Sequence, residues 1–129
     1  MKMKSLLLLA LMMLLPFAAN AEPQDEPAYR GKIGQYKVTL VFYTFNFDKG
    51  DVAGYYYYND RPKTRFKLVC RKNEGDPRGF NTLVLDEYTP KGKNTGTFRG
   101  TLEGRGDGFY GTFTNSKGER FKFDLHQEW

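Results

Sequence analysis

The residues that could act as nucleophiles, bases or metal ligands are few in this chain. After residue 21 there is one serine, Ser116, one histidine, His126, and one cysteine, Cys70. A hydrolase needs its nucleophile within hydrogen-bond reach of a base, but the pattern assigns these residues to a turn, the C-terminal end and an inward strand position. One histidine and one cysteine cannot supply the three or four ligands of a zinc site. We therefore expect no enzymatic activity, no metal and no cofactor.

A pair of carboxylates could hydrolyse glycosides if both faced one cavity. Asp86 and Glu87 are adjacent on a predicted strand, so they point to opposite faces and cannot form such a pair. Glu87 shares the inward phase of Leu83 and Leu85. An inward carboxylate at a barrel rim is either tied to tyrosine or backbone donors or used to orient a ligand.

Tyrosines are the most distinctive feature of the chain. Four are consecutive, Tyr55, Tyr56, Tyr57 and Tyr58, and Tyr43 lies in the preceding segment. A tyrosine ring with its polar tip suits stacking on a sugar or filling a partner's pocket, although tyrosine is also simply a good strand residue. The predicted binding residues, for a small molecule, a glycan or a protein, are Tyr43, Tyr55, Tyr56, Tyr57, Tyr58 and Glu87.

Strand alternation divides these residues between two faces. A small ligand would bind inside, near Tyr56, Tyr58 and Glu87, and Tyr56 should also belong to the core. A protein partner would bind outside, where we expect Tyr55 and Tyr57 to form an exposed aromatic patch. The side of the preceding segment opposite Leu40 and Phe42 is also apolar, with Val41, Tyr43, Phe45 and Phe47, and Tyr43 and Phe45 would extend this patch.

The elements that position these side chains are short segments of β-branched and aromatic residues separated by turn residues. No stretch has helical periodicity, so we predict an all-β fold with no long helix. The expected strands are Tyr29 to Ile33, Tyr36 to Thr44, Val52 to Tyr58, Thr64 to Arg71, Thr82 to Tyr88, Thr95 to Glu103, Gly108 to Thr114 and Arg120 to Leu125. Short links between consecutive strands predict an antiparallel meander.

One face of nearly every predicted strand is apolar, as in Phe66, Leu68 and Cys70, with charged residues between them. A sheet of about eight strands with one apolar face and no helix to cover it must bury that face against itself. We therefore predict a single small antiparallel barrel. Gly54, Gly100 and Gly111 fall in the inward phase, where they either let a strand bend, give room to a large side chain or clear space for a ligand.

The first 21 residues have the three parts of a secretory signal peptide: Lys2 and Lys4, an apolar run, and Ala19-Asn20-Ala21 as a cleavage site. We expect a signal peptide over 1–21, cleaved after Ala21, a flexible leader over 22–28 and a barrel domain over 29–129. The apolar run is short for a membrane anchor, so we expect no membrane span and a periplasmic or secreted protein.

Charge and cysteine content restrict the partners. The chain carries 20 basic and 15 acidic residues, and cleavage would remove two of the basic ones. The remaining excess is small and interspersed, which disfavours nucleic acid as a partner. Cys70 cannot form an internal disulfide and is predicted to be a buried hydrophobe. We expect a monomer or a weak dimer.

Several segments resemble small uncharacterised exported proteins of Gram-negative bacteria. The similar segments are Tyr29-Arg30-Gly31-Lys32-Ile33-Gly34, Gly54-Tyr55-Tyr56-Tyr57, Leu85-Asp86-Glu87-Tyr88, Thr95-Gly96-Thr97-Phe98-Arg99-Gly100 and Gly111-Thr112-Phe113. The resemblance implies the fold and an exported location, and it carries no activity. The general plan also looks like avidin-type and lipocalin-type barrels, but no signature residue for either ligand is present.

A second resemblance is to periplasmic inhibitors of c-type lysozyme, small eight-stranded barrels with a Ser-Gly-x-x-Tyr motif. The comparable segment here is Ala53-Gly54-Tyr55-Tyr56-Tyr57, in which alanine replaces the serine and its hydroxyl. The basic charge of the chain is also a poor match for a basic enzyme. An inhibitor of lysozyme-type cell-wall enzymes is therefore the alternative to an exported, non-enzymatic binding module.

Overall fold

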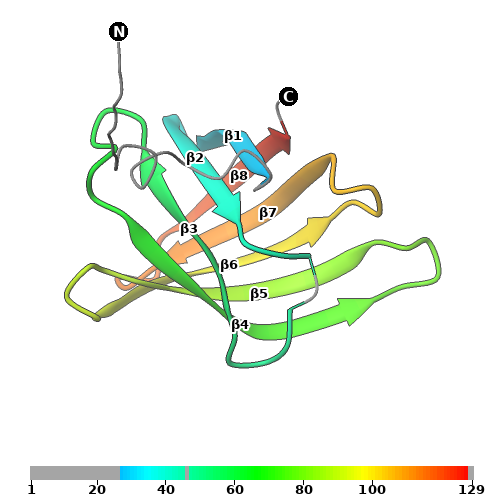
Figure 1. Ribbon diagram of the computed structural model, residues 1–129. Coiled ribbons are helices and arrows are strands. Elements are labelled where there is room, and N and C mark those ends of the chain that lie inside the picture. Colours follow the sequence, from blue (N-terminus) through cyan, green and yellow to red (C-terminus); the bar gives the residue numbers. More distant parts are fainter. Residues whose placement is uncertain (1–26, 46, 128–129) are drawn as a thin grey trace, which may run out of the picture.

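Eight strands make up the part of the chain described by the computed structural model, residues 27–45 and 47–127 (Figure 1). The strands are β1 (Ala28–Ile33), β2 (Tyr36–Phe42), β3 (Val52–Tyr58), β4 (Phe66–Gly75), β5 (Asn81–Tyr88), β6 (Asn94–Leu102), β7 (Gly108–Asn115) and β8 (Arg120–Gln127). The expected signal peptide and most of the expected leader lie outside the described residues. β1 begins at Ala28, one residue earlier than expected.

Each strand pairs antiparallel with the next one along the chain, and β1 also pairs with β8, which closes the sheet into a barrel. The predicted fold class, an all-β antiparallel meander barrel of eight strands, is confirmed. Among the described residues there is no helix long and apolar enough to cross a membrane.

The largest boundary difference is in β4, which continues to Gly75, beyond the predicted end at Arg71. A register shift between Cys70 and Lys72 lets this polar segment keep pairing with β5. The Asn81 amide donates to the Asn73 side-chain oxygen at 2.8 Å across the extension. Polar residues without hydrophobic alternation give no strand signal, which is why the sequence pattern missed this extension.

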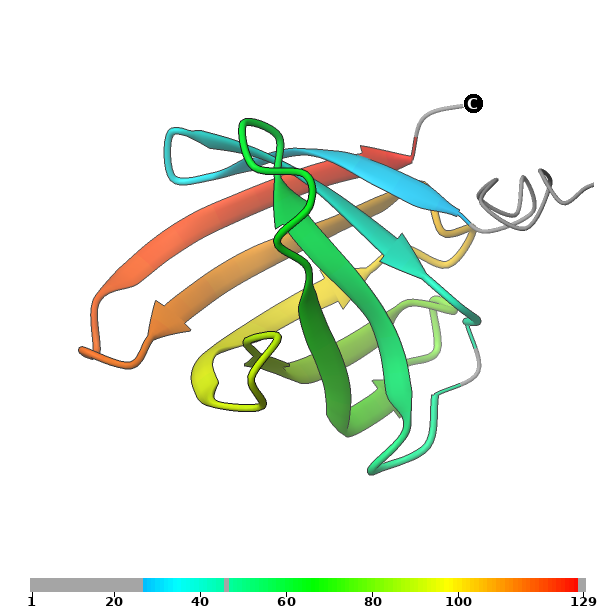
Figure 2. The ribbon, with the colours of Figure 1, turned by 60° about the vertical axis from the view of Figure 1, so that its left-hand side comes forward.

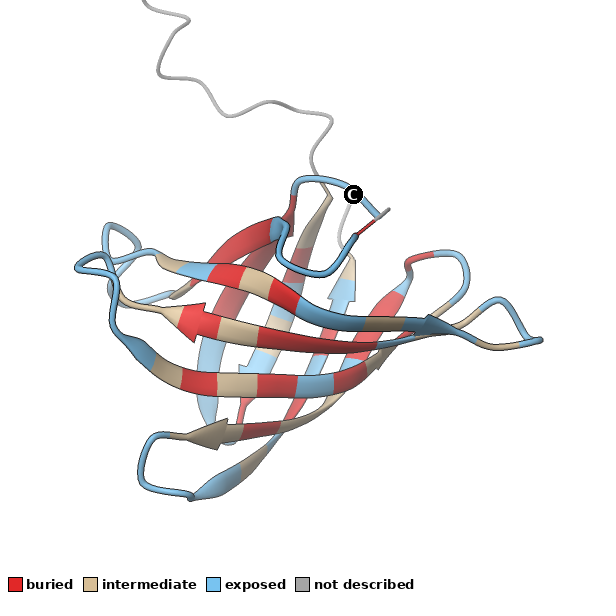
Figure 3. Cartoon of the chain, turned by 90° about the horizontal axis from the view of Figure 1, so that it is seen from below, coloured by how far each residue is buried: buried red, intermediate tan, exposed pale blue. Residues whose placement is uncertain are grey.

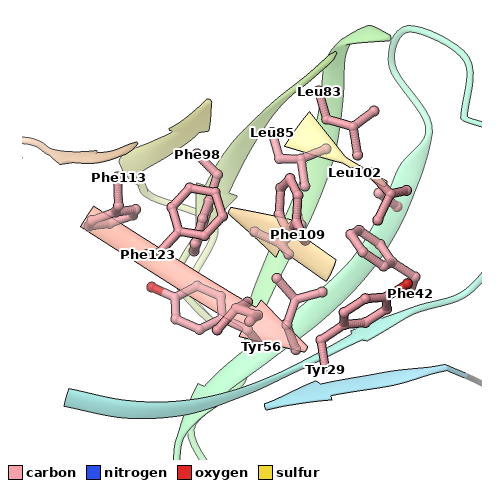
Figure 4. Close-up of a cluster of buried hydrophobic side chains, with 14 of the residues drawn as sticks. Tyr29, Phe42, Tyr56, Leu83, Leu85, Phe98, Leu102, Phe109, Phe113 and Phe123 are labelled. Carbon is pink, nitrogen blue, oxygen red and sulfur yellow. The ribbon is translucent and has the colours of Figure 1, made fainter. Parts of the chain in front are cut away.

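Buried and exposed residues alternate along the strands, as the period-two pattern predicts (Figure 3). The interior is filled with aromatic rings in edge-to-face and tilted contacts; the centroids of Phe98 and Phe113 lie 4.8 Å apart, and those of Phe109 and Phe123 also 4.8 Å apart. Figure 4 shows these rings gathered in one cluster inside the barrel. The barrel is therefore a packed core, and Cys70 is buried within it as predicted.

The inward glycines allow neighbouring strands and side chains to pack closely. A Cβ at Gly54 would lie 1.9 Å from the Val41 carbonyl oxygen, and a Cβ at Gly111 would lie 2.1 Å from that of Arg99. At Gly100 a Cβ would lie 2.6 Å from the Phe123 ring. The large-neighbour interpretation is thus correct at Gly100, and at Gly54 and Gly111 the neighbouring backbone leaves no room for a side chain. Strand bending at these glycines stays a prediction.

The two ends of the barrel differ. At one end, in the β2–β3 connection, Phe47 is buried against Phe42 with ring centroids 5.2 Å apart. At the same end the Tyr29 hydroxyl donates a hydrogen bond to the Gly106 carbonyl. We call this the closed end. The expectation that Phe47 lies on the outer face is wrong, because β2 ends at Phe42 and strand alternation does not continue into the loop. Phe45 is exposed, and its ring packs against Tyr29 and Phe42.

The hairpins β1–β2, β3–β4, β5–β6 and β7–β8 lie at the opposite end, where Figure 2 shows the β1–β2 and β7–β8 turns on the left. We call this the open end. The hydroxyl groups of Tyr56 and Tyr29 point to opposite ends of the core cluster (Figure 4). The Tyr56 hydroxyl of β3 therefore points toward the open end.

Candidate functional site

A cavity of about 250 Å³ lies at the open end. All four hairpins of this end contribute to it, mainly with inward-facing residues at the ends of the strands. The lining residues are Ile33, Tyr36, Tyr58, Phe66, Glu87, Phe113, Asn115 and Phe121. A concave, mostly apolar site with one convergent charged group is the usual form of a small-molecule site.

Aromatic rings form most of the wall. The Tyr58 ring makes edge contacts with Tyr36 and with Phe66, at centroid distances of 6.2 and 6.1 Å. Tyr36 stands at the mouth and is 59% exposed. Below them the fully buried Tyr56 lies 5.7 Å from Tyr58 and 5.1 Å from Phe66. These rings present flat apolar faces and edges to whatever enters.

Glu87 is the charged group of the cavity, and only 5% of it is exposed. One carboxylate oxygen accepts from the Tyr56 hydroxyl and the other accepts from the Thr95 hydroxyl at 2.6 Å. Burial raises the pKa of Glu87, and the two hydrogen bonds lower it by less. Among the described residues no cation forms an ion pair with this carboxylate.

Tyr56, on the core side of the cavity, donates a hydrogen bond to Glu87. Burial, followed by the charge of Glu87, raises the pKa of Tyr56, so its hydroxyl stays protonated and donates. A carboxylate has about four acceptor sites, so two remain after the bonds from Tyr56 and Thr95. The structure thus shows the tyrosine-tied carboxylate expected from the sequence, and this tie leaves room for a further donor.

The six predicted residues separate into the two expected groups. Tyr56, Tyr58 and Glu87 come together at the inner end of the cavity. Asp86 points outward, where its carboxylate pairs with Arg71 at 2.5 Å, so the two acids do not face each other.

The outer group is Tyr43, Tyr55 and Tyr57. Tyr43 and Tyr55 have ring centroids 5.9 Å apart, and Tyr55 stacks with Tyr57 at 6.4 Å. The Arg65 guanidinium lies over the Tyr55 ring at 4.4 Å, and Tyr55 is only 7% exposed. Contrary to expectation, Tyr55 is not part of an exposed patch, because its neighbours cover it.

Sequence reasoning did not single out the other cavity residues, notably Tyr36, Phe66 and Phe121. Each was placed in a strand with its inward phase readable, but the pattern does not say which strand ends meet across a barrel. Inward aromatic residues next to the β1–β2, β3–β4, β5–β6 and β7–β8 turns would have identified them, because these turns meet at one end of a closed meander.

One further motif has a structural explanation. Arg105-Gly106-Asp107, a tripeptide known from cell-adhesion ligands, forms the β6–β7 turn, in which Gly106 is buried and has a φ of 74°. The Gly106 carbonyl accepts a hydrogen bond from the Tyr29 hydroxyl. In the described part of the chain, no three histidine, cysteine or acidic side chains lie close enough together to hold a metal ion.

Comparisons of the chain with protein-family models, with curated proteins and with solved structures give no match. The resemblance to exported Gram-negative proteins therefore stays a prediction, and the chemistry of the site rests on its own residues.

Proposed function

We propose that this protein is an exported, non-enzymatic binding module and that its site is the cavity at the open end of the barrel. The observation that carries the proposal is a cavity walled by aromatic rings with one buried carboxylate at its inner end. Such a site offers a large apolar contact and a single fixed acceptor, which gives both affinity and orientation.

The dimensions of the cavity limit the ligand. Its volume of about 250 Å³ is slightly below the range of about 300–1,000 Å³ typical of ligand pockets. The packed core below Tyr56 prevents a ligand from reaching further along the axis. A compact ligand of one or two rings, with its far side in solvent, fits these limits.

The alternative, inhibition of a lysozyme-type enzyme, would use the rim loops and the outer tyrosines. The open-end loops of this barrel are basic, and a basic enzyme would be repelled by them. With Tyr55 covered by its neighbours, the outer face also has less exposed aromatic surface for a partner. The cavity is therefore the better-supported site.

Binding can be tested with 2-naphthol, a neutral two-ring compound with one hydroxyl donor. We expect saturable, one-to-one binding by titration calorimetry. Tyr36→Ala removes one wall of the mouth and should weaken binding by about fivefold, since an aromatic pair contributes about 0.5–1.5 kcal/mol. Phe121→Trp should weaken binding by occupying part of the cavity.

The matched control is Tyr110→Ala, which removes another exposed strand tyrosine, away from the cavity. It should leave the affinity unchanged. Equal losses of affinity in Tyr36→Ala and Tyr110→Ala would contradict the proposed site.

A further inference from the structure

We infer that the ligand of the open-end cavity is an amphiphilic anion: an apolar body, a hydrogen-bond donor directed at Glu87, and an acidic group held at the mouth. The acidic group can be a carboxylate, sulfate or phosphate. This inference rests on the proposed function and adds the class of ligand to it.

The first observation is an unequal distribution of charge between the two ends. The open-end connections, residues 34–35, 59–65, 89–93 and 116–119, contain six basic and two acidic residues, a net charge of +4. The closed-end connections, residues 43–51, 76–80 and 103–107, contain three basic and five acidic residues, a net charge of −2. Such a field draws an anion toward the end that carries the cavity.

The second observation is where the open-end cations lie. Four exposed lysines, Lys63, Lys91, Lys93 and Lys117, have no ion-pair partner among the described residues. Lys63 and Lys117 belong to the β3–β4 and β7–β8 hairpins, which supply lining residues from opposite sides of the cavity. Arg65 does not belong to this set, because it covers the outer tyrosines.

Arg61 connects the basic loops to the cavity wall. Its guanidinium lies 5.6 Å from the centre of the Tyr58 ring, and Tyr58 lines the cavity. Its ion pair with Asp60 is long, 3.7 Å, and both side chains are at least 70% exposed. Exposed pairs of this kind are weak, so the guanidinium can bind an incoming anion in the bidentate geometry that arginine favours.

Glu87 then fixes the direction in which the ligand enters. An anion at the inner end would lie beside a buried carboxylate, with no described cation paired to that carboxylate to offset the repulsion. A hydroxyl, amide or other N–H group would instead use one of the unfilled acceptor sites. The acidic group therefore points out toward the basic mouth.

Four naphthalene probes separate these contributions: 2-naphthol, 2-naphthoate, 6-hydroxy-2-naphthoate and 6-(aminomethyl)-2-naphthol. We expect 6-hydroxy-2-naphthoate to bind at least tenfold tighter than 2-naphthol, and the cationic amine to bind weakest. Removing the inner hydroxyl, in 2-naphthoate, should weaken binding at least threefold. The advantage of the carboxylate over 2-naphthol should shrink as salt is raised from 20 to 500 mM, since exposed charges are screened.

The matching variants neutralise equal numbers of charges at the two ends. Lys63→Gln/Lys117→Gln should reduce the affinity for 6-hydroxy-2-naphthoate at least fivefold and leave that for 2-naphthol unchanged. Lys49→Gln/Arg105→Gln, at the closed end, should change neither affinity. Circular dichroism and the unfolding midpoint of each variant establish that it is folded.

The two proposals can fail separately. Equal affinities for 2-naphthol and its carboxylate, or tightest binding of the amine, would overturn the anionic ligand class and keep the cavity as the site. Failure of every probe to bind would overturn the proposed function and the inference together.

Discussion

At the residue scale, Glu87 is the charged group of the cavity, and burial of its ionised carboxylate destabilises the folded state. Its carboxylate is buried beneath aromatic rings, and burial raises its pKa above the ordinary glutamate value of 4.5. The folded protein therefore binds the Glu87 proton more tightly than the unfolded chain does. The resulting stabilisation is complete below pH 4.5 and is lost as the pH rises through the folded-state pKa.

This linkage predicts the behaviour of Glu87→Gln, which cannot ionise. The unfolding free energy of the wild type, minus that of Glu87→Gln, should fall as the pH rises from 4.5 and level off above the folded-state pKa of Glu87. Urea denaturation at closely spaced pH values measures this difference. Hydrogen bonds from arginine lower the pKa values of Asp76 and Asp86. Both residues are present in the two proteins, so their contributions cancel in the difference. A difference that does not vary with pH would show that Glu87 titrates normally.

At the element scale, β3 serves as core, cavity wall and outer surface within four residues. Tyr56 and Tyr58 face inward and Tyr55 and Tyr57 face outward, as strand alternation requires. An outward direction does not make a tyrosine exposed, because Tyr55 faces outward and is covered by Arg65 and by its tyrosine neighbours.

Single alanine substitutions in β3 should therefore give graded losses of stability. Tyr56→Ala should cost about 3–5 kcal/mol, as for other large buried aromatics. Tyr55→Ala should lower the free energy of unfolding by about 2 kcal/mol, within the range for burying a large side chain. Tyr57 is half-buried, so Tyr57→Ala should lower it by about 1 kcal/mol or less. Urea unfolding of the three variants gives this order. Equal costs for Tyr55→Ala and Tyr57→Ala would show that the cover over Tyr55 does not persist in solution.

At the scale of the whole molecule, the barrel separates stability from binding along its axis. The closed end is sealed by Phe47 and by the hydrogen bond from Tyr29 to Gly106, while the cavity and the exposed lysines Lys63, Lys91, Lys93 and Lys117 lie at the other end. A change at one end should then have little effect on the other, because the residues that seal the closed end are not among those that line the cavity.

Phe47→Ala tests this separation. Loss of the buried ring should cost about 3 kcal/mol or more, and the affinity for 2-naphthol, measured where the variant is fully folded, should equal that of the wild type. The comparison variant is Tyr36→Ala, for which we expect the opposite: little loss of stability and weaker binding. A loss of affinity in folded Phe47→Ala would mean that the loop at the closed end affects the cavity through the core.

The sequence alone determined the strands, their inward faces, the closure of the sheet and the inward position of Glu87. These follow from local rules, since side chains alternate along a strand and an apolar face without a helix must close on itself. The division of Tyr56 and Tyr58 from Tyr55 and Tyr57 has the same origin.

Tertiary structure alone decided which side chains meet. The cavity combines Tyr36, Tyr58, Glu87 and Phe121 from strands far apart in the sequence, and only the closed register brings their ends together. The inward turn of Phe47 and the cover of Arg65 over Tyr55 are likewise made by loops and neighbouring strands. The reason is physical: a residue's direction is set by its own backbone, whereas its exposure and its partners are set by long-range packing.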